Sequence, residues 1–131
     1  MTSFRLLITG SRNANPLQAT NALRAQFKSL VEYCEQNDTT PVVIHGGAHG
    51  VDSLAQRVAE EFQAITTIRV PAQWDKYGKA AGYLRNEHMV TKWKPHACLA
   101  ITTGSPGTQH TIDLCAKHEV PTRVIEVEEQ S

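Results

Sequence analysis

Three short segments of the sequence combine glycine with small or polar residues in a way that suits anion binding: TGSR (9–12), HGGAHG (45–50) and TGSPGT (103–108). Glycine lets a backbone approach a ligand closely. The N–H groups at the start of a helix carry a partial positive charge that attracts phosphate. In TGSPGT the hydroxyls of Ser105 and Thr108 would add further donors. The alternative is that each segment is a tight turn with helix-capping residues.

A second candidate element is the segment YLRNEHMV (83–90), where a helix would place Arg85, Asn86 and Met89 on one face. Arg85 could hold a phosphate or carboxylate with two parallel hydrogen bonds. Asn86 could orient a sugar hydroxyl or a backbone group. The alternative is a solvated arginine beside an asparagine that caps a loop.

Asp52 and two aromatic residues are weaker candidates. Asp52 falls in the first turn of a predicted helix, where a carboxylate favours the helix dipole and accepts backbone N–H bonds. We favour that structural role, because a catalytic or ribose-binding role would require proximity to Arg85. Trp74 and Tyr77 could stack on a base, although packing at the rim of a site is slightly favoured.

The motifs of metal and standard cofactor sites are missing from the sequence. His45 and His49 are four residues apart, but the glycines between them prevent one helix from presenting both. The sequence contains neither a G-x-x-x-x-G-K-[ST] loop nor, in TGSRNANP, a G-x-G-x-x-G fingerprint. We therefore expect no metal and no cofactor.

Composition indicates one neutral, cytoplasmic domain. The chain has 131 residues, with 13 Lys and Arg balanced by 13 Asp and Glu, and this balance argues against nucleic acid or membrane as the main partner. Cys34, Cys98 and Cys115 lie far apart within apolar patterns, so buried free thiols are expected. The apolar run near the N-terminus is too short for a signal peptide, and no stretch is long enough to span a membrane.

Strand-like and helix-like patterns alternate along the chain. The fold class is therefore α/β, with a five-stranded parallel sheet of order 3-2-1-4-5 and helices on both faces. The last residues, EEQS, are expected to fray. The predicted strands are 4–9, 41–45, 65–70, 97–102 and 122–127, and the predicted helices start near Pro16, cover the apolar pattern 51–62, and run from about 78 to 93 and from about 108 to 118.

These elements place the three glycine-rich segments at one edge of the sheet. Ligands of open α/β sheets bind beyond the carboxyl ends of the strands, near the point where the strand order reverses. One glycine turn is weak evidence, because many strand-to-helix connections need one for steric reasons. Three at that edge indicate an anion-binding site.

The segments ITGSR, VIHGGAHGVDSLA, PAQWDKYGKAAGYLRNEHM and TGSPGTQHTIDLCAKHEVP resemble the small Rossmann-like SLOG superfamily, and within it the YspA-like branch. The similarity covers nearly the whole chain, with the motifs in the family's order. It implies a single Rossmann-like domain, residues 1–131, that binds nucleotides or nucleotide-derived ligands. The matching positions are Gly46, Gly47, Gly50 and Asp52 in one loop, Arg85 and Asn86 in the middle element, and Gly104, Gly107 and Thr108 in the other loop.

The chain departs from the LOG-type phosphoribohydrolases of the same superfamily. Their P-G-G-x-G-T-x-x-E signature ends in a glutamate that helps to cleave the base–ribose bond, and the corresponding position here is Thr111, preceded by His110. A threonine cannot act as a general base at neutral pH. LOG-type hydrolysis would therefore need Asp52, Asp75 or Glu87 as a substitute.

DprA, another member of the superfamily, binds single-stranded DNA, which requires a positive groove and stacking surfaces. This chain is neutral overall, so single-stranded DNA is the second-ranked partner. The basic residues that could gather near one edge are Arg5, Arg12, Lys76, Lys79, Arg85 and Lys92. The resemblance and the small core also lead us to expect a homodimer.

The combined expectation is a sensor or sequestering protein for a nucleotide. The phosphate is expected on residues 104–108, and the base or sugar toward the loop after the second strand and the helix that carries Arg85. The predicted nucleotide-binding residues are Gly10, Ser11, Arg12, Gly46, Gly47, Gly50, Asp52, Trp74, Arg85, Asn86, Gly104, Ser105, Gly107 and Thr108.

Overall fold

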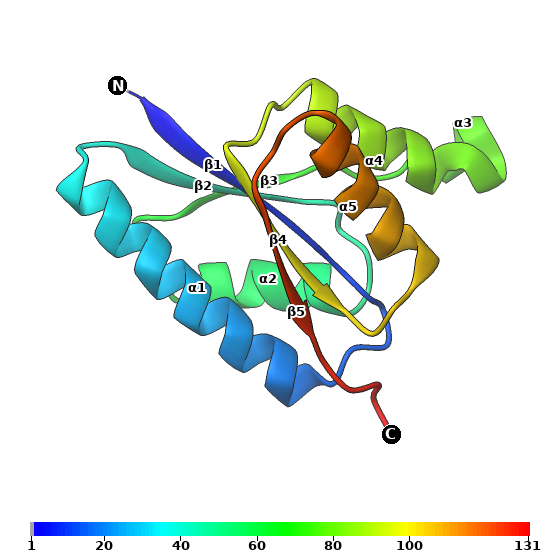
Figure 1. Ribbon diagram of the computed structural model, residues 1–131, viewed down its shortest axis with the longest axis horizontal. Helices are drawn as coiled ribbons and strands as arrows, with labels where there is room; N and C mark the ends of the chain where they lie inside the picture. The colour runs from blue at the N-terminus through cyan, green and yellow to red at the C-terminus, as the bar shows by residue number, and fades with distance from the viewer. Residues whose placement is uncertain (1) are drawn as a thin grey trace.

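A computed structural model describes residues 2–131 and shows a five-stranded, all-parallel sheet of order β3-β2-β1-β4-β5 (Figure 1). This confirms the fold class and the strand order expected from the sequence. Each predicted strand agrees with the observed one to within about one residue at either end. The strands are β1 Ser3–Gly10, β2 Thr40–His45, β3 Thr66–Arg69, β4 Ala97–Thr102 and β5 Thr122–Glu126.

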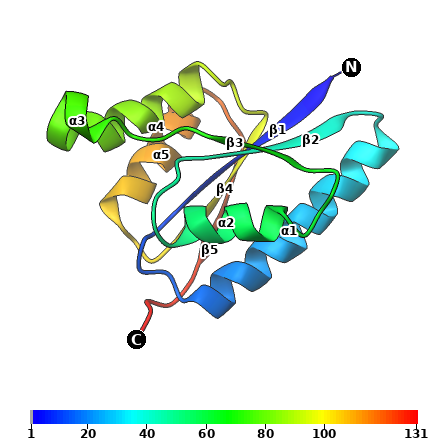
Figure 2. The same ribbon diagram turned by 180° about the vertical axis from the view of Figure 1, so that it is seen from behind.

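The helices cover both faces of this sheet. Figures 1 and 2 show α1 and α2 together on one face and α4 and α5 on the other. Their bounds are α1 Pro16–Gln36, α2 Val51–Ala59, α3 Trp74–Tyr77, a short 3₁₀ helix η1 Gly78–Ala80, α4 Ala81–Thr91 and α5 Pro106–Lys117.

Alternation along the central strand β1 divides the core into two layers. Leu6 and Ile8 point to the side of α1 and α2, and both are almost completely buried there. Leu7, between them, is fully buried on the opposite side together with Met89 of α4 and Cys115 of α5. A strand buried on both faces reads as a continuous apolar run, which is why this part of the sequence predicts a central parallel strand.

The region between β3 and β4 differs from its prediction. The helix expected over 78–93 begins as the 3₁₀ helix η1 and continues as α4 to Thr91, and it is preceded by the short helix α3, which was not expected. Gly78 ends α3 with a φ of 58°, and its N–H bonds to the carbonyl of Trp74. This left-handed conformation, which glycine adopts without a steric penalty, terminates α3 and lets the chain restart at a new angle.

Three other boundaries also differ. The helix that follows β2 ends at Ala59, so Phe62 packs on the core from a turn, and α5 starts two residues before the expected Thr108. The expectation of a frayed tail is wrong. Glu129 forms an antiparallel bridge with Ala14, and the backbone of residues 128 and 130 bonds to Asn15 and Asn13.

The cysteine prediction is confirmed, because Cys34, Cys98 and Cys115 are all buried and free. In the part of the chain that the structure describes, every helix is too short or too polar to cross a bilayer.

Candidate functional site

A cavity of about 450 Å³ lies at the carboxyl end of β1, between the starts of α2 and α5 and one face of α4. This is the edge at which open parallel sheets bind ligands. Its volume falls in the range of small-molecule sites. The lining residues are Thr9, Gly10, Arg12, Asn13, Ala48, Asp52, Trp74, Lys79, Gly82, Tyr83, Arg85, Asn86, Met89, Ser105, Gly107 and Thr108.

The loop between β2 and α2 is filled by the protein's own side chains. A Cβ on Gly46 would overlap the guanidinium of Arg85, and one on Gly47, whose φ is 71°, would overlap the side chain of Arg69. Gly50, with a φ of 78°, lies against the backbone carbonyls of Ser11 and Arg12, 2.6 Å from an added Cβ. These glycines are required by packing inside the molecule.

The peptide of Gly46 joins Asp52 to Arg85. Its N–H donates to Oδ2 of Asp52 at 3.1 Å, and its carbonyl accepts from Nη1 of Arg85 at 2.6 Å. Oδ2 also accepts from the N–H of Ala48 at 3.2 Å. Asp52 therefore accepts backbone N–H bonds, as expected, but from the loop before its helix. Through that loop, Arg85 and Asp52 are held at the same cavity wall.

The loop between β4 and α5 is open. Gly104 has a φ of 97°, and a Cβ added to it or to Gly107 would have no atom within 4 Å in residues 2–131. Ser105 occupies the N-cap position of α5 without a side-chain cap bond. The N–H groups in the first turn of α5 are thus left for other acceptors, and Gly107 lies on the cavity wall.

Three hydroxyls are linked beneath this loop. Oγ of Ser105 bonds to Oγ of Ser11 at 2.6 Å and to Oγ1 of Thr108 at 3.0 Å, and Ser11 also accepts from the N–H of Thr103. Two hydrogen bonds among three hydroxyls leave one O–H proton unused. The free O–H lies at one end of this chain, on Ser11 or on Thr108, and Thr108 is the end at the cavity wall.

Arg85 is held in place from two sides. Its Nε donates to Oδ1 of Asn86 at 2.8 Å, and Nη1 is taken by Gly46. Asn86 is buried, and its Nδ2 lies 3.4 Å from Nδ1 of His110, which must accept because the amide nitrogen can only donate. Within the described residues, Nη2 of Arg85 has no such partner, so it is free to donate into the cavity.

The cavity is positive apart from one carboxylate. Arg12, Lys79 and Arg85 line it with Asp52. Burial lowers the pKa of Arg85, the Asp52 carboxylate opposes this, and the charge of Arg12 adds to it. Two neighbouring arginines, one of them partly buried, are stabilised by an anion between them. In residues 2–131 no group of three or more His, Cys, Asp or Glu side chains is arranged to hold a metal.

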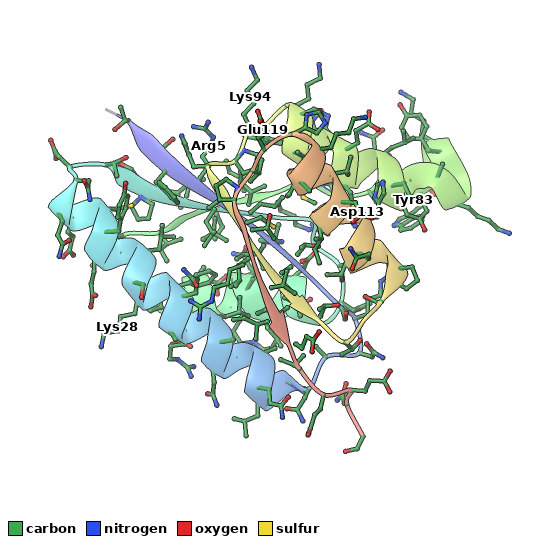
Figure 3. All side chains as sticks on the ribbon, viewed as in Figure 1. Arg5, Lys28, Tyr83, Lys94, Asp113 and Glu119 are labelled. Carbon is green, nitrogen blue, oxygen red and sulfur yellow. The ribbon has the colours of Figure 1, made fainter. Side chains whose placement is uncertain are left out.

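Two aromatic rings stand at the rim. Trp74 is 49% exposed and lies over Gly82, whose added Cβ would be 3.4 Å from the indole. Tyr83 is 51% exposed and contacts the ring of His110 edge-on at 4.6 Å; Figure 3 shows it on the side of α4 that faces α5. Tyr77, the other predicted stacking residue, lines a separate cavity on the far side of α4.

Most of the predicted binding residues line the cavity, and the others lie outside its lining. Tyr83 was missed as a site residue, and Lys79 was named only among the basic residues that could gather near one edge. Tyr83, Asn86 and Met89 recur at helical spacing and all line the cavity, which is the signal that would have found Tyr83. The predicted residues that line it are Gly10, Arg12, Asp52, Trp74, Arg85, Asn86, Ser105, Gly107 and Thr108, and those outside its lining are Ser11, Gly46, Gly47, Gly50 and Gly104.

Comparison with known proteins identifies a relative over almost the whole chain. The Gene 61 protein of Mycobacterium phage D29 is 34% identical over 122 residues, which cover 89% of this chain and 92% of that protein. The chain belongs to the family of this phage protein. No protein-family model matches the sequence. Because the name of the Gene 61 relative states no activity, the function has to be inferred from the cavity.

Proposed function

We propose that this member of the Gene 61 family binds a nucleotide or a nucleotide-derived small molecule and acts as a sensor or sequestering protein. The observation that carries the proposal is that one cavity joins an open helix N-terminus and free cationic groups to two exposed aromatic rings. The phosphate would bind at Gly107 and Thr108, where it reaches N–H groups and a hydroxyl. The base would stack at Trp74 or Tyr83.

Binding without turnover is favoured over LOG-type hydrolysis. Thr111, which occupies the position of the LOG glutamate, is completely buried, and its hydroxyl donates to the carbonyl of Gly107 at 3.5 Å. Of the three carboxylates that could replace that glutamate, only Asp52 lines the cavity. The placement in the SLOG superfamily, YspA-like branch, remains part of the proposal and rests on the motifs of the sequence.

Single-stranded DNA is the second candidate, and one observation favours it. A neighbouring cavity of about 530 Å³ on the far side of α4 is lined by Arg69, Lys76 and His88 together with the rings of Tyr77 and Trp93. Basic and aromatic side chains in one groove are what strand-binding proteins use. Binding there would weaken steeply with salt, because it would release counterions.

The proposal is tested by a thermal-shift screen with nucleoside mono-, di- and triphosphates, cyclic nucleotides, ADP-ribose and a short DNA oligomer. A ligand at a hundredfold excess over its Kd should raise stability by about 2.7 kcal/mol. Mass spectrometry of each sample then separates binding from turnover: an intact ligand supports a sensor, and a cleaved one makes the protein an enzyme. Sedimentation in the same buffers tests the homodimer that the sequence leads us to expect.

A matched pair of variants shows whether binding uses this cavity. Arg12→Ala removes an exposed cavity cation, and Arg57→Ala removes an exposed arginine of α2 outside it. Arg12→Ala should weaken phosphate-bearing ligands about tenfold, which is the loss of one charge-assisted hydrogen bond. Arg57→Ala should leave affinity unchanged. Equal behaviour of the two variants would place the binding site elsewhere.

A further inference from the structure

One oxygen of Asp52 is unaccounted for by the fold. The residue is only 6% exposed, and Oδ2 takes both backbone hydrogen bonds from Gly46 and Ala48. Oδ1 is buried, and it receives no hydrogen bond from any residue between 2 and 131. Leaving a buried carboxylate oxygen without a donor is costly, and such groups in native proteins call for an explanation.

Among the described residues, no neighbour of Asp52 donates a hydrogen bond to Oδ1. His45 faces it from β2, but Nδ1 of that ring accepts from the N–H of Gly47, so Nε2 carries the proton and donates to Oε1 of Gln56 at 2.7 Å. Arg85 faces it from α4, where Nη1 and Nε bond to Gly46 and Asn86 and Nη2 makes no hydrogen bond to Oδ1. The charge of Arg85 acts on the carboxylate, but neither group hydrogen-bonds to Oδ1.

Asp52 is also the one acidic side chain among the described residues that line the cavity, beside Arg12, Lys79 and Arg85. A site built only for phosphate would be weakened by a buried negative charge at its wall. A ligand that carries both an anion and a hydrogen-bond donor satisfies the whole lining. The ribose hydroxyls of a nucleotide are such donors, at a fixed distance from its phosphate.

We propose that Oδ1 of Asp52 accepts a hydrogen bond from a ribose hydroxyl, so that this cavity selects ribonucleotides over their deoxy forms. The proposal rests on the nucleotide binding proposed above and names its substrate class. It assigns two separate roles to Asp52. Oδ2 holds the loop after β2 through its backbone hydrogen bonds, and Oδ1 binds the ribose hydroxyl.

The test compares ribonucleoside 5′-monophosphates and 5′-diphosphates with their 2′-deoxy and 3′-deoxy forms by calorimetric titration of the wild-type protein. One deoxy form should bind about tenfold or more weakly, the effect of leaving a charged acceptor unpaired. This comparison needs no variant and is therefore independent of any effect on folding. Equal affinity for all three forms overturns the proposal.

Asp52→Asn provides the second arm. The amide oxygen can still accept from Gly46 and Ala48, while an NH₂ donor replaces Oδ1. The variant should bind the ribonucleotide and the deoxy form with equal affinity, because the loss of the negative charge changes the affinity of both forms alike. Retained discrimination in this variant overturns the assignment of Oδ1. If every form binds equally and Arg12→Ala weakens them all, only this inference fails. If neither these forms nor any nucleotide of the thermal-shift screen binds, the proposed function fails with it.

Discussion

The loop between β2 and α2 and the loop between β4 and α5 both place glycines where a strand passes into a helix, but only the second leaves the space beside them open. In the first loop, protein atoms occupy the place of an added Cβ at Gly46, Gly47 and Gly50. In the second, an added Cβ at Gly104 or Gly107 meets no atom within 4 Å in the described chain. One loop is shaped by internal packing, and the other presents its backbone outward.

This difference shows what a glycine in a sequence does and does not report. A glycine can indicate that a side chain is not tolerated at that position, or that the backbone has a positive φ there. It does not indicate whether the space that a Cβ would occupy is filled by other atoms of the protein or by a ligand. The double glycine at 46 and 47 makes room for Arg85 and Arg69, and so it contributes to the site indirectly, by fixing one of the cavity's cations.

The largest effect is expected for Gly50→Ala. A Cβ there would lie 2.6 Å from two backbone carbonyls, at a φ of 78° that alanine rarely adopts. Strain and overpacking together should lower the free energy of unfolding by roughly 2–5 kcal/mol. Urea denaturation measures the loss. Gly107→Ala is the control and should be neutral or stabilising by up to about 1 kcal/mol, as for alanine in a helix; equal losses in both variants would remove the distinction between the loops.

A smaller effect, on binding alone, is expected for Gly107→Ala. The added methyl group would stand at the cavity wall in the first turn of α5, where the phosphate is proposed to approach the backbone. Affinity for the best nucleotide of the screen should fall about tenfold or more, a change of about 1.4 kcal/mol. Calorimetric titration of the folded variant measures it. Unchanged affinity would mean that the phosphate does not rest on this loop.

The fold could be predicted because its signals are local. Short apolar runs bounded by glycine and proline predict buried strands, and Leu23, Phe27, Leu30 and Cys34 repeat at the spacing of one helix face. The helix α3 was missed because four residues are too few to show a helical repeat of apolar positions. Gly78 closes α3 with a positive φ, and the sequence pattern does not distinguish a glycine that ends one helix from a glycine that starts the next.

The site could be predicted only in part, because its geometry depends on contacts distant in sequence. Arg85 and Asn86 were identifiable from their spacing on one helix face. The hydroxyl chain from Ser11 to Ser105 joins residues 94 positions apart, and no local pattern encodes it. Oδ1 of Asp52 has no partner because the nearby donors of His45 and Arg85 bond to Gln56 and Gly46 instead, and these contacts are not visible in the sequence.

The smallest expected effect is on the pH dependence of stability. It tests whether the protein without ligand already stabilises the Asp52 carboxylate. Burial raises the pKa of Asp52 above the ordinary 3.8, against the bonds from Ala48 and Gly46 and the charge of Arg85. Between 3.8 and that raised value the folded state binds more protons than the unfolded state, so stability falls as pH rises. The fall amounts to about 1.4 kcal/mol for each unit by which the pKa is raised.

Asp52→Asn removes this contribution because an amide does not titrate. Urea midpoints measured without ligand from pH 3.5 upward should therefore fall less with rising pH in Asp52→Asn than in the wild type. The exposed pair of Glu61 with Arg24, which lowers the pKa of Glu61, acts in the opposite direction, but it is the same in both proteins and cancels in their difference. Parallel curves would show that the fold satisfies the carboxylate without a ligand, and the loop after β2 would then be a packing element alone.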